Sequence, residues 1–367
     1  MRYTDAVRRR LDAGVLVLGG ALVGVLLLVG AALAEDGASS APIEIGESPL
    51  LSAGPVEYRP GRGLRLGPTG AVIGGFTNIK GEYTKEDGGE FAVDKLNFFL
   101  ILDRWTRFRA VAELQLRDIY VADNEGSGTK DFAFDVRRLF GDFVLTDELH
   151  VRAGTFLTEV GYWNLILAEP LTWTTEAPLI IEETFFQPTT TGLMLHGTRG
   201  VGGGQFGYSL FSQFLKPLED DPDLDPADYT AGARVEYGAG TAWSVGASYQ
   251  AADTNDEWSH LGGLHAVWQH QRGEVQGEFY YQDGDALESS QWGAYLQGVF
   301  AFHPPVYLVG RYEHFDPVSG EPTLNLFTAG WVYKPFPFMA FKIEYRFVDR
   351  EPDDDPEGLF ASFTTFF

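Results

Sequence analysis

The sequence predicts an all-β fold, a transmembrane antiparallel β-barrel of about 16 strands with an inward-folded long third loop. From Gly70 onward, apolar and polar residues alternate with period two in segments of roughly nine to fifteen residues. The connections between these segments alternate between tight turns and longer polar loops, which is typical of barrels inserted from one side of a membrane. The mean hydropathy of -0.11 is too low for a bundle of membrane helices.

The amino terminus predicts a secretory signal peptide over residues 1–34. An apolar run from Val15 to Ala34 follows Arg8, Arg9 and Arg10, and small residues of the A-x-A type precede Glu35. The alternative is an uncleaved helical anchor, since about 20 apolar residues can span a bilayer. Residues 35–69, rich in Gly, Pro and Ser, are expected to form a periplasmic leader segment, and residues 70–367 the transmembrane barrel.

Composition excludes several functional classes. The formal net charge is -25, and removal of residues 1–34 takes away four Arg and two Asp and leaves -27. Such acidity argues against nucleic acid as a partner. A chain without Cys has no disulfide and no thiolate metal site, and neither H-E-x-x-H nor G-x-S-x-G occurs. We therefore expect no enzymatic activity, no cofactor and no metal site.

The strand pattern is clearest in RFRAVAELQLR, Arg107 to Arg117. Its even-numbered residues are apolar, while most of the odd-numbered ones are charged or amide side chains. A soluble sandwich with one wet face could show the same alternation. The sixteen predicted strands are 70–80, 89–103, 106–121, 131–146, 149–157, 188–198, 205–216, 227–238, 241–252, 258–271, 274–283, 289–302, 306–316, 322–334, 338–350 and 357–367.

The connections favour a barrel over a sandwich. Short turns such as DRWT, YGAG and QRGE alternate with polar loops such as KGEYTKEDGG, AADTNDE and DREPDDDPEG. Short turns on one side and long loops on the other are typical of outer-membrane barrels, whose closure satisfies every backbone group in hydrocarbon. Aromatic residues near strand ends predict interfacial girdles, formed by Trp105, Trp173, Trp243, Trp258, Trp268, Trp292, Tyr333 and Phe336.

The third long connection, residues 158–187, differs from the other loops because it is long and partly apolar. It includes the runs Leu165 to Leu167 and Leu179 to Ile181. A 16-stranded barrel has a lumen wide enough for water, so this loop is expected to fold inward against the wall and narrow the lumen. The alternative is a loop that packs over the barrel mouth or against a neighbouring subunit.

The stretches VRAGTFLTEVGYWNLILAEPLTW and TTTGLMLHG resemble the strand-loop-strand pattern of the phosphate-selective porin O/P-like group, and the whole architecture resembles the general sixteen-stranded porins. The matching positions are Gly154, Phe156, Thr158, Gly161, Trp163, Asn164, Thr191, Gly192 and Gly197. The chain departs from the pattern at Glu159-Val160, where a Pro is common.

This resemblance implies an outer-membrane porin, a water-filled channel for passive diffusion of small hydrophilic solutes or ions. The implied partners are outer-membrane lipids and lipopolysaccharide, the barrel-assembly machinery and two further copies in a homotrimer. One alternative is a non-transporting barrel that serves as an adhesin or envelope scaffold. Another is a solute-specific channel for anions such as phosphate.

A constriction is predicted where a basic wall faces an acidic loop. The wall residues come from the second to fifth predicted strands and are Lys95, Arg107, Arg109, Arg117, Arg137 and Arg152. The loop residues are Glu159, Tyr162, Trp163, Glu169, Glu176, Glu182 and Glu183. Arg137 and Arg138 can both face inward only if the strand bulges. Charges in a water-filled lumen set ion preference, and the acidic excess predicts a mild preference for cations. Alternatively, the charges form structural pairs such as Arg109–Glu113.

The chain ends in LFASFTTFF, Leu359 to Phe367, which predicts the strand that closes the barrel against the first. Leu359, Phe363 and Phe367 are expected to face outward, and Phe360 and Phe366 inward. The terminal Phe preceded by alternating apolar residues resembles the signal that the barrel-assembly machinery recognises. We therefore expect Phe363 and Phe367 to act as the assembly signal.

Overall fold

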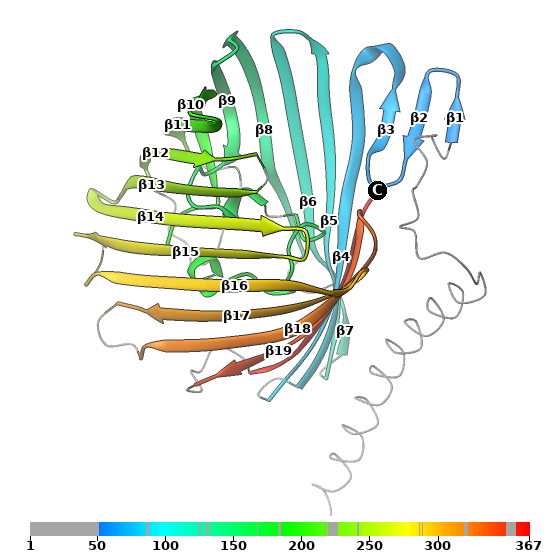
Figure 1. The fold of residues 1–367 in the computed structure, drawn as a ribbon, viewed down its shortest axis with the longest axis vertical. Helices are drawn as coiled ribbons and strands as arrows, with labels where there is room; N and C mark the ends of the chain where they lie inside the picture. Colours follow the sequence, from blue (N-terminus) through cyan, green and yellow to red (C-terminus); the bar gives the residue numbers. More distant parts are fainter. Residues whose placement is uncertain are drawn as a thin grey trace, which may run out of the picture.

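The computed structural model describes residues 51–367 apart from 86–87, 125, 130–131, 167, 183–184, 217, 219–226, 241, 286, 288, 319–321 and 350–356. The predicted signal peptide lies outside the described residues. Sixteen antiparallel strands form a closed barrel (Figure 1). No helix in this described part of the chain is long and apolar enough to cross a membrane.

The barrel strands follow one another around the wall in chain order. They are β4 (Ala71–Thr84), β5 (Gly88–Trp105), β6 (Phe108–Asp123), β8 (Ala133–Thr146), β9 (Leu149–Leu157), β10 (Thr189–Val201), β11 (Gly204–Leu215), β12 (Tyr229–Gly238), β13 (Trp243–Thr254), β14 (Glu257–His270), β15 (Gly273–Gly284), β16 (Gln291–His303), β17 (Val306–Asp316), β18 (Leu324–Phe336), β19 (Met339–Val348) and β20 (Gly358–Phe366). All sixteen predicted strands are confirmed, and two predictions, 149–157 and 306–316, have the same bounds as β9 and β17.

Closure depends on β20, which pairs with β19 on one side and with β4 on the other. The pairing with β4 runs from Gly358 opposite Thr84 to Phe366 opposite Phe76. Phe367 then exchanges two backbone hydrogen bonds with Gly75, of 2.9 and 3.1 Å. The carboxy-terminal segment is therefore the predicted closing strand, and each barrel strand has a hydrogen-bonded neighbour on both edges.

Three short strands, which the sequence pattern did not predict, precede the barrel. They are β1 (Leu51–Ala53), β2 (Val56–Arg59) and β3 (Gly63–Leu66), and the 3-10 turn η1 (Gly67–Thr69) leads from β3 into β4. β3 pairs with the beginning of β4, beyond the end of β20 (Figure 1). Each strand is too short to show a period, but glycines with positive φ at Gly54, Gly61 and Gly63 form the turns.

The two rims differ, although less strictly than predicted. On one rim, here called the short-turn rim, tight turns join β5 to β6, β8 to β9, β10 to β11, β12 to β13, β14 to β15, β16 to β17 and β18 to β19. The opposite rim carries the longer connections and the small strand β7 (Gly126–Gly128). The predicted loop AADTNDE is instead a two-residue turn at Asn255 and Asp256, whose φ angles are 56° and 68°. Asn and Asp tolerate this left-handed conformation, so the strands β13 and β14 extend into the segment.

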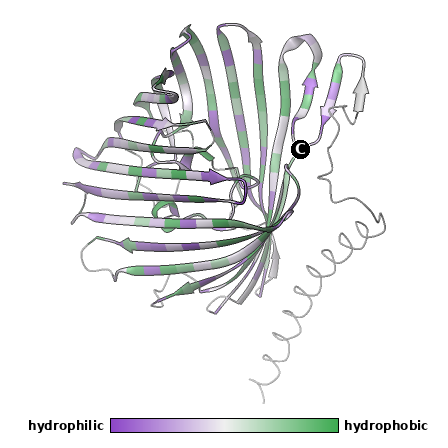
Figure 2. Ribbon diagram, viewed as in Figure 1, coloured by the Kyte–Doolittle hydropathy of each residue, from purple (hydrophilic) through white to green (hydrophobic). Residues whose placement is uncertain are grey.

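Alternation divides the side chains between the two faces of the wall, and Figure 2 shows it as hydrophobic and hydrophilic bands along each strand. Outward residues such as Leu264 and Leu296 are more than half exposed, whereas the inward Gln297 is fully buried. Trp105, Trp243 and Trp268 lie exposed at strand ends near the short-turn rim, as expected for a girdle.

Trp173 was wrongly predicted in the girdle. It belongs to the inserted loop, where its indole N–H donates to Glu274 (3.1 Å) and its ring lies 3.8 Å from the Lys334 Nζ. An indole in the lumen can satisfy its N–H and also pack against an inward-facing cation, so an aromatic residue near a strand end does not have to face lipid.

The seam between β20 and β4 requires glycine at position 75. A Cβ there would lie 2.0 Å from the Asn97 backbone carbonyl and 2.6 Å from the Phe367 ring. We predict that Gly75→Ala forces the backbones apart at a cost of about 1–3 kcal/mol. The measurement is the temperature at which the purified barrel loses its compact migration in an SDS gel, which should fall. Gly310→Ala is the matched control, because a Cβ at Gly310 meets nothing within 4 Å. An unchanged temperature for Gly75→Ala would contradict the prediction.

Candidate functional site

The long connection between β9 and β10, residues 158–188 apart from 167, 183 and 184, lies inside the barrel (Figure 1). It contains two short helical turns, η2 (Trp163–Ile166) and α2 (Leu179–Glu182). Inward-facing side chains of β12, β13, β15, β17, β19 and β20 form hydrogen bonds with it. The prediction that this loop folds into the barrel is therefore confirmed, and the alternative that it packs over the barrel mouth is wrong.

Carboxylates of the wall satisfy the backbone N–H groups of the loop. Glu278 on β15 accepts from Tyr162 (2.7 Å) and Trp163 (2.8 Å), with one carboxylate oxygen for each. Glu344 on β19 and Glu313 on β17 do the same for Thr175, Glu176 and Leu179, at 2.9, 3.2 and 2.7 Å. An irregular loop leaves such N–H donors without backbone partners, so these carboxylates hold it at fixed points.

Two buried cations hold the loop carbonyls. Arg311 on β17 is fully buried and donates to Glu313 (2.6 Å), the Thr174 hydroxyl (2.7 Å) and the carbonyls of Glu176 and Ala177 (both 3.0 Å). Lys342 on β19 uses its three donors on Glu169 O, Thr172 Oγ1 and Thr174 O, at 2.7–2.9 Å. Buried N–H donors need hydrogen-bond acceptors, and the loop supplies them for both Arg311 and Lys342.

Apolar packing completes the attachment of the loop. Val160, Trp163, Leu179, Ile180, Phe185 and Phe186 of the loop form one cluster with Leu261, Tyr280, Tyr295, Phe315, Leu324 and Leu326 of the wall. These wall residues are apolar or aromatic at positions that would otherwise face a polar lumen. The apolar residues that distinguish this loop from the others in the sequence therefore pack against the inner wall of the barrel.

The loop leaves a cavity between itself and the opposite wall of β4, β5, β6 and β8. Its volume is about 240 Å³. The charged residues that line it are the cations Lys80, Lys95, Arg137 and Arg138, all from the wall, and the acids Asp94, Glu113, Glu169, Glu176 and Glu182, the last three from the loop. A basic wall thus faces an acidic loop across this space.

Ion pairs join the two sides of the cavity. Lys95 lies 2.7 Å from Glu169, and Lys80 lies 2.9 Å from Glu176. Burial by itself would raise the pKa of Glu176, but the Lys80 ammonium and the Arg346 guanidinium lower it to about 2. The Glu176 carboxylate therefore stays ionised across the usual pH range.

Glu182 differs from Glu176 in its electrostatic surroundings. Burial raises the pKa of Glu182 to about 7, with Glu176 and Glu313 as nearby like charges, although Arg346 at 3.4 Å opposes the shift. The Glu182 side chain is still about 30% exposed, and it lines the cavity. One of the loop carboxylates is thus poised to change its charge near neutral pH.

A β-bulge places two adjacent arginines on the inner face. β6 and β8 shift register between Glu113 and Leu114, so that Arg138 lies opposite Glu113 while Val136 lies opposite Leu114. Arg137 is the extra residue, and both arginines line the cavity. Arg138 forms a short ion pair with Glu113, and Arg137 donates to Gln115 at 3.2 Å. The bulge is the condition under which the sequence allowed both to face inward.

The structure brings together only some of the residues predicted at the constriction. Those that line the cavity are Lys95, Arg137, Trp163, Glu169, Glu176 and Glu182. The others lie elsewhere. Arg107 and Arg109 are exposed toward the short-turn rim, Arg117 pairs with Asp135 at 2.6 Å, and Arg152 pairs with Asp142. Glu159 lies 3.9 Å from Arg234, and the Tyr162 ring stacks on His265. Glu183 lies outside the described residues. The suggested Arg109–Glu113 pair is replaced by Arg138–Glu113.

Several residues of the site were not predicted. Lys80 and Arg138 line the cavity, and Arg311, Lys342 and Arg346 lie under or beside the loop. Alternation in the sequence FKIEYRF, residues 341–347, puts Lys342 and Arg346 on one face of the strand. The pattern predicts which side chains share a face of the strand, but it does not predict which charged side chains the loop covers. The position of the loop depends on contacts between residues far apart in the sequence.

Comparisons with solved structures show the same fold in known outer-membrane proteins. OmpF of Salmonella typhi, in complex with daunomycin, is 12% identical, with a TM-score of 0.58 over 81% of this chain and 97% of that one. The anion-selective porin of Comamonas acidovorans is 13% identical, with a TM-score of 0.56 over 81% and 99%. The outer-membrane protein OmpT of Vibrio cholerae is 8% identical, with a TM-score of 0.57 over 86% and 99%. No protein-family model matches the chain, and no curated protein matches it.

The chain therefore has the fold of the bacterial outer-membrane porins, as the sequence resemblance implied.

Removal of Arg311 tests how the loop is held. We predict that Arg311→Ala leaves Glu313 and two loop carbonyls buried without their partner, a loss of about 3–5 kcal/mol. Limited proteolysis should then cut within residues 158–187 at protease concentrations that leave the wild type intact. Arg199→Ala is the control, because the Arg199–Glu148 pair is exposed on both sides and is worth little. Equal cleavage of the two variants would show that Arg311 does not hold the loop.

Proposed function

We propose that the protein is a porin, a water-filled channel for passive diffusion of small hydrophilic solutes or ions across a bacterial outer membrane. The observation that carries the proposal is the cavity in which a basic wall faces the acidic inserted loop. Opposed charges across a narrow aqueous passage create a transverse field, which orients dipolar solutes and sets ion preference. The constriction consists of loop 158–187 and the wall cations Lys80, Lys95, Arg137 and Arg138.

The charges at this constriction nearly balance. Four cations and five carboxylates line the cavity, which leaves one net negative charge when all are ionised. The proposed channel therefore has a weak preference for cations, despite its arginines. A channel specific for phosphate-like anions needs an excess of cations at the narrowest point, so this alternative is disfavoured.

The remaining parts of the proposal concern the setting of the channel. The outward apolar residues and aromatic girdle fit contact with outer-membrane lipids and lipopolysaccharide. One solved OmpT of Vibrio cholerae is a trimer form, and we propose a homotrimer here as well. We assign the protein no enzymatic activity. Phe363 and Phe367 at the closing strand are proposed as the signal for the barrel-assembly machinery.

Planar-bilayer recording tests the channel directly. We predict stepwise single-channel conductance from the purified protein, with a reversal potential under a KCl gradient that indicates weak cation preference. Arg137→Gln combined with Arg138→Gln should raise the cation-to-anion permeability ratio about twofold or more, because two positive charges leave the constriction. Arg199→Gln, which removes a charge from the exposed end of β10, should not change this ratio.

Three outcomes would contradict this proposal in different ways. A folded barrel without conductance would be an adhesin or scaffold rather than a porin. Conductance with saturable block by one solute would identify a solute-specific channel. Clear anion preference in the wild type would mean that the arginine wall dominates the loop acids.

The pH dependence of ion preference tests the assignment of Glu182. As pH falls from 8 to 6, Glu182 takes up a proton because its pKa is raised to about 7, and the constriction loses a negative charge. The cation-to-anion permeability ratio should therefore fall. Comparison with Glu182→Gln isolates the Glu182 contribution, and Glu148→Gln, an exposed acid at the short-turn rim, serves as control. A wild-type change equal to that of Glu182→Gln would refute the assignment.

A further inference from the structure

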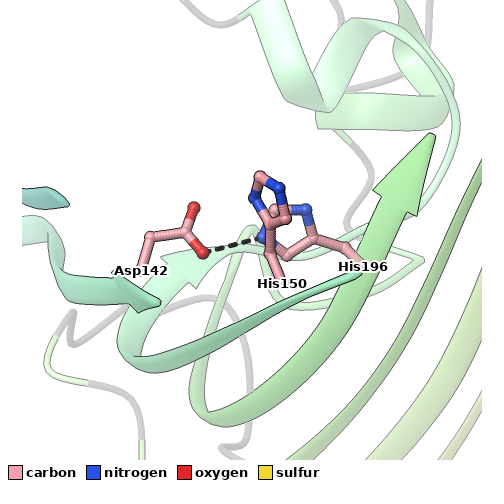
Figure 3. Close-up of side chains that lie close together, drawn as sticks. All are labelled: Asp142, His150 and His196. Atoms are coloured by element: carbon pink, nitrogen blue, oxygen red, sulfur yellow. Dashed lines mark hydrogen bonds and ion pairs between the residues drawn. The ribbon is translucent and has the colours of Figure 1, made fainter. Parts of the chain in front are cut away.

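Two histidines and an aspartate meet on the inner wall near the short-turn rim. Asp142 belongs to β8, His150 to β9 and His196 to β10, and Figure 3 shows the three side chains close together. One potential ligand atom from each lies within 4.8 Å of the other two. His196 Nε2 is 2.9 Å from Asp142 Oδ1, and the rings of His150 and His196 are 5.2 Å apart.

Strand pairing fixes this arrangement. His196 lies directly opposite His150 in the β9–β10 ladder, and β8 places Val144 opposite His150 from the other side. The three residues thus come from consecutive strands of one continuous sheet, and none of them lines the constriction cavity. A cluster built on strands keeps its geometry better than one built on loops.

The chemistry of these groups matches a divalent metal of the zinc type. Imidazole nitrogens together with one carboxylate suit Zn²⁺ and other first-row transition metals, whereas Mg²⁺ and Ca²⁺ prefer oxygen ligands throughout. Ligands about 2.1 Å from a tetrahedral metal lie about 3.4 Å from one another. The atoms here are separated by 2.9 Å to at most 4.8 Å, so side-chain adjustment of about 1 Å is enough.

The surroundings orient the carboxylate. Arg152 donates to Asp142 Oδ2 at 2.8 Å and lies 4.2 Å above the Phe140 ring, so Oδ1 is the oxygen turned toward the imidazoles. Such an outer partner orients a ligand in metal sites. Arg152 also cancels the charge of Asp142, and the exposed Arg109 is the register partner of Asp142 on β6. A metal ion therefore meets no negative field, which limits its affinity and keeps it exchangeable.

We propose that Asp142, His150 and His196 form a lumenal binding site for a divalent first-row transition metal, with Zn²⁺ as the representative ion. Three protein ligands leave a fourth position open to water or to a group on a passing solute. The site is a property of the folded barrel and does not require that the barrel conducts. It reverses the expectation that the chain has no metal site. That expectation was based on sequence motifs, and these histidines are far apart in the sequence and meet only through strand register.

Zinc titration of the intact folded barrel in detergent tests the proposal. Isothermal titration with ZnCl₂ should show one ion bound per chain, and MgCl₂ should show none. His150→Gln combined with His196→Gln should weaken Zn²⁺ binding at least tenfold, and Asp142→Asn should weaken it less while preserving the shape of the site. His260→Gln combined with His303→Gln, two exposed histidines outside the cluster, should leave it unchanged.

The outcomes separate the site from folding and from channel activity. Compact migration on an unheated SDS gel confirms that each variant is folded before titration. Absence of Zn²⁺ binding to the wild type would overturn the proposal, as would equal binding by the wild type and the folded His150→Gln/His196→Gln variant. Binding without any single-channel conductance would support the metal site while refuting the porin.

Discussion

The structure depends on one constraint, that every backbone hydrogen-bonding group in hydrocarbon must have a partner within the protein. β20 meets it by pairing with both β19 and β4. Once the sheet is closed, each strand has one face toward lipid and one toward the lumen, so alternation in sequence becomes a division between the two sides. The same closure creates an interior large enough to hold a thirty-residue loop, which then needs partners of its own.

The wall supplies those partners, and its two halves differ in how they contact the loop. Toward β12 to β20 the inward side chains are committed to the loop: Glu278, Glu313 and Glu344 accept its N–H groups, and Arg311 and Lys342 donate to its carbonyls. Toward β4 to β8 the charges remain beside open space. The half that binds the loop therefore determines where the open space of the lumen lies, and the other half supplies most of the positive charges that line it.

Much of the fold could be predicted from the sequence because period-two alternation and turn residues are local signals. RFRAVAELQLR and LFASFTTFF have the faces their alternation indicates, with Phe360 packed between Lys80 and Arg346 beneath the loop. Strands β1 to β3 were missed because three or four residues cannot show a period. The site was only partly predictable, since register, the bulge at Arg137 and the side of the lumen covered by the loop follow from contacts between distant segments.

Two strands, β3 and β20, pair with the same edge of β4, and this arrangement affects how the barrel closes. β3 occupies the edge as far as Ile73, and β20 with Phe367 takes it from Gly75 onward, so only Gly74 separates the two. The β3–β4 hairpin is local and can form early, whereas β20 must arrive from the far end of the chain. A closing strand that slid by two residues toward the rim would run into β3. The β3–β4 hairpin thus blocks further sliding and sets the register of the last pairing, where a slip of a single residue would turn Phe360 toward lipid.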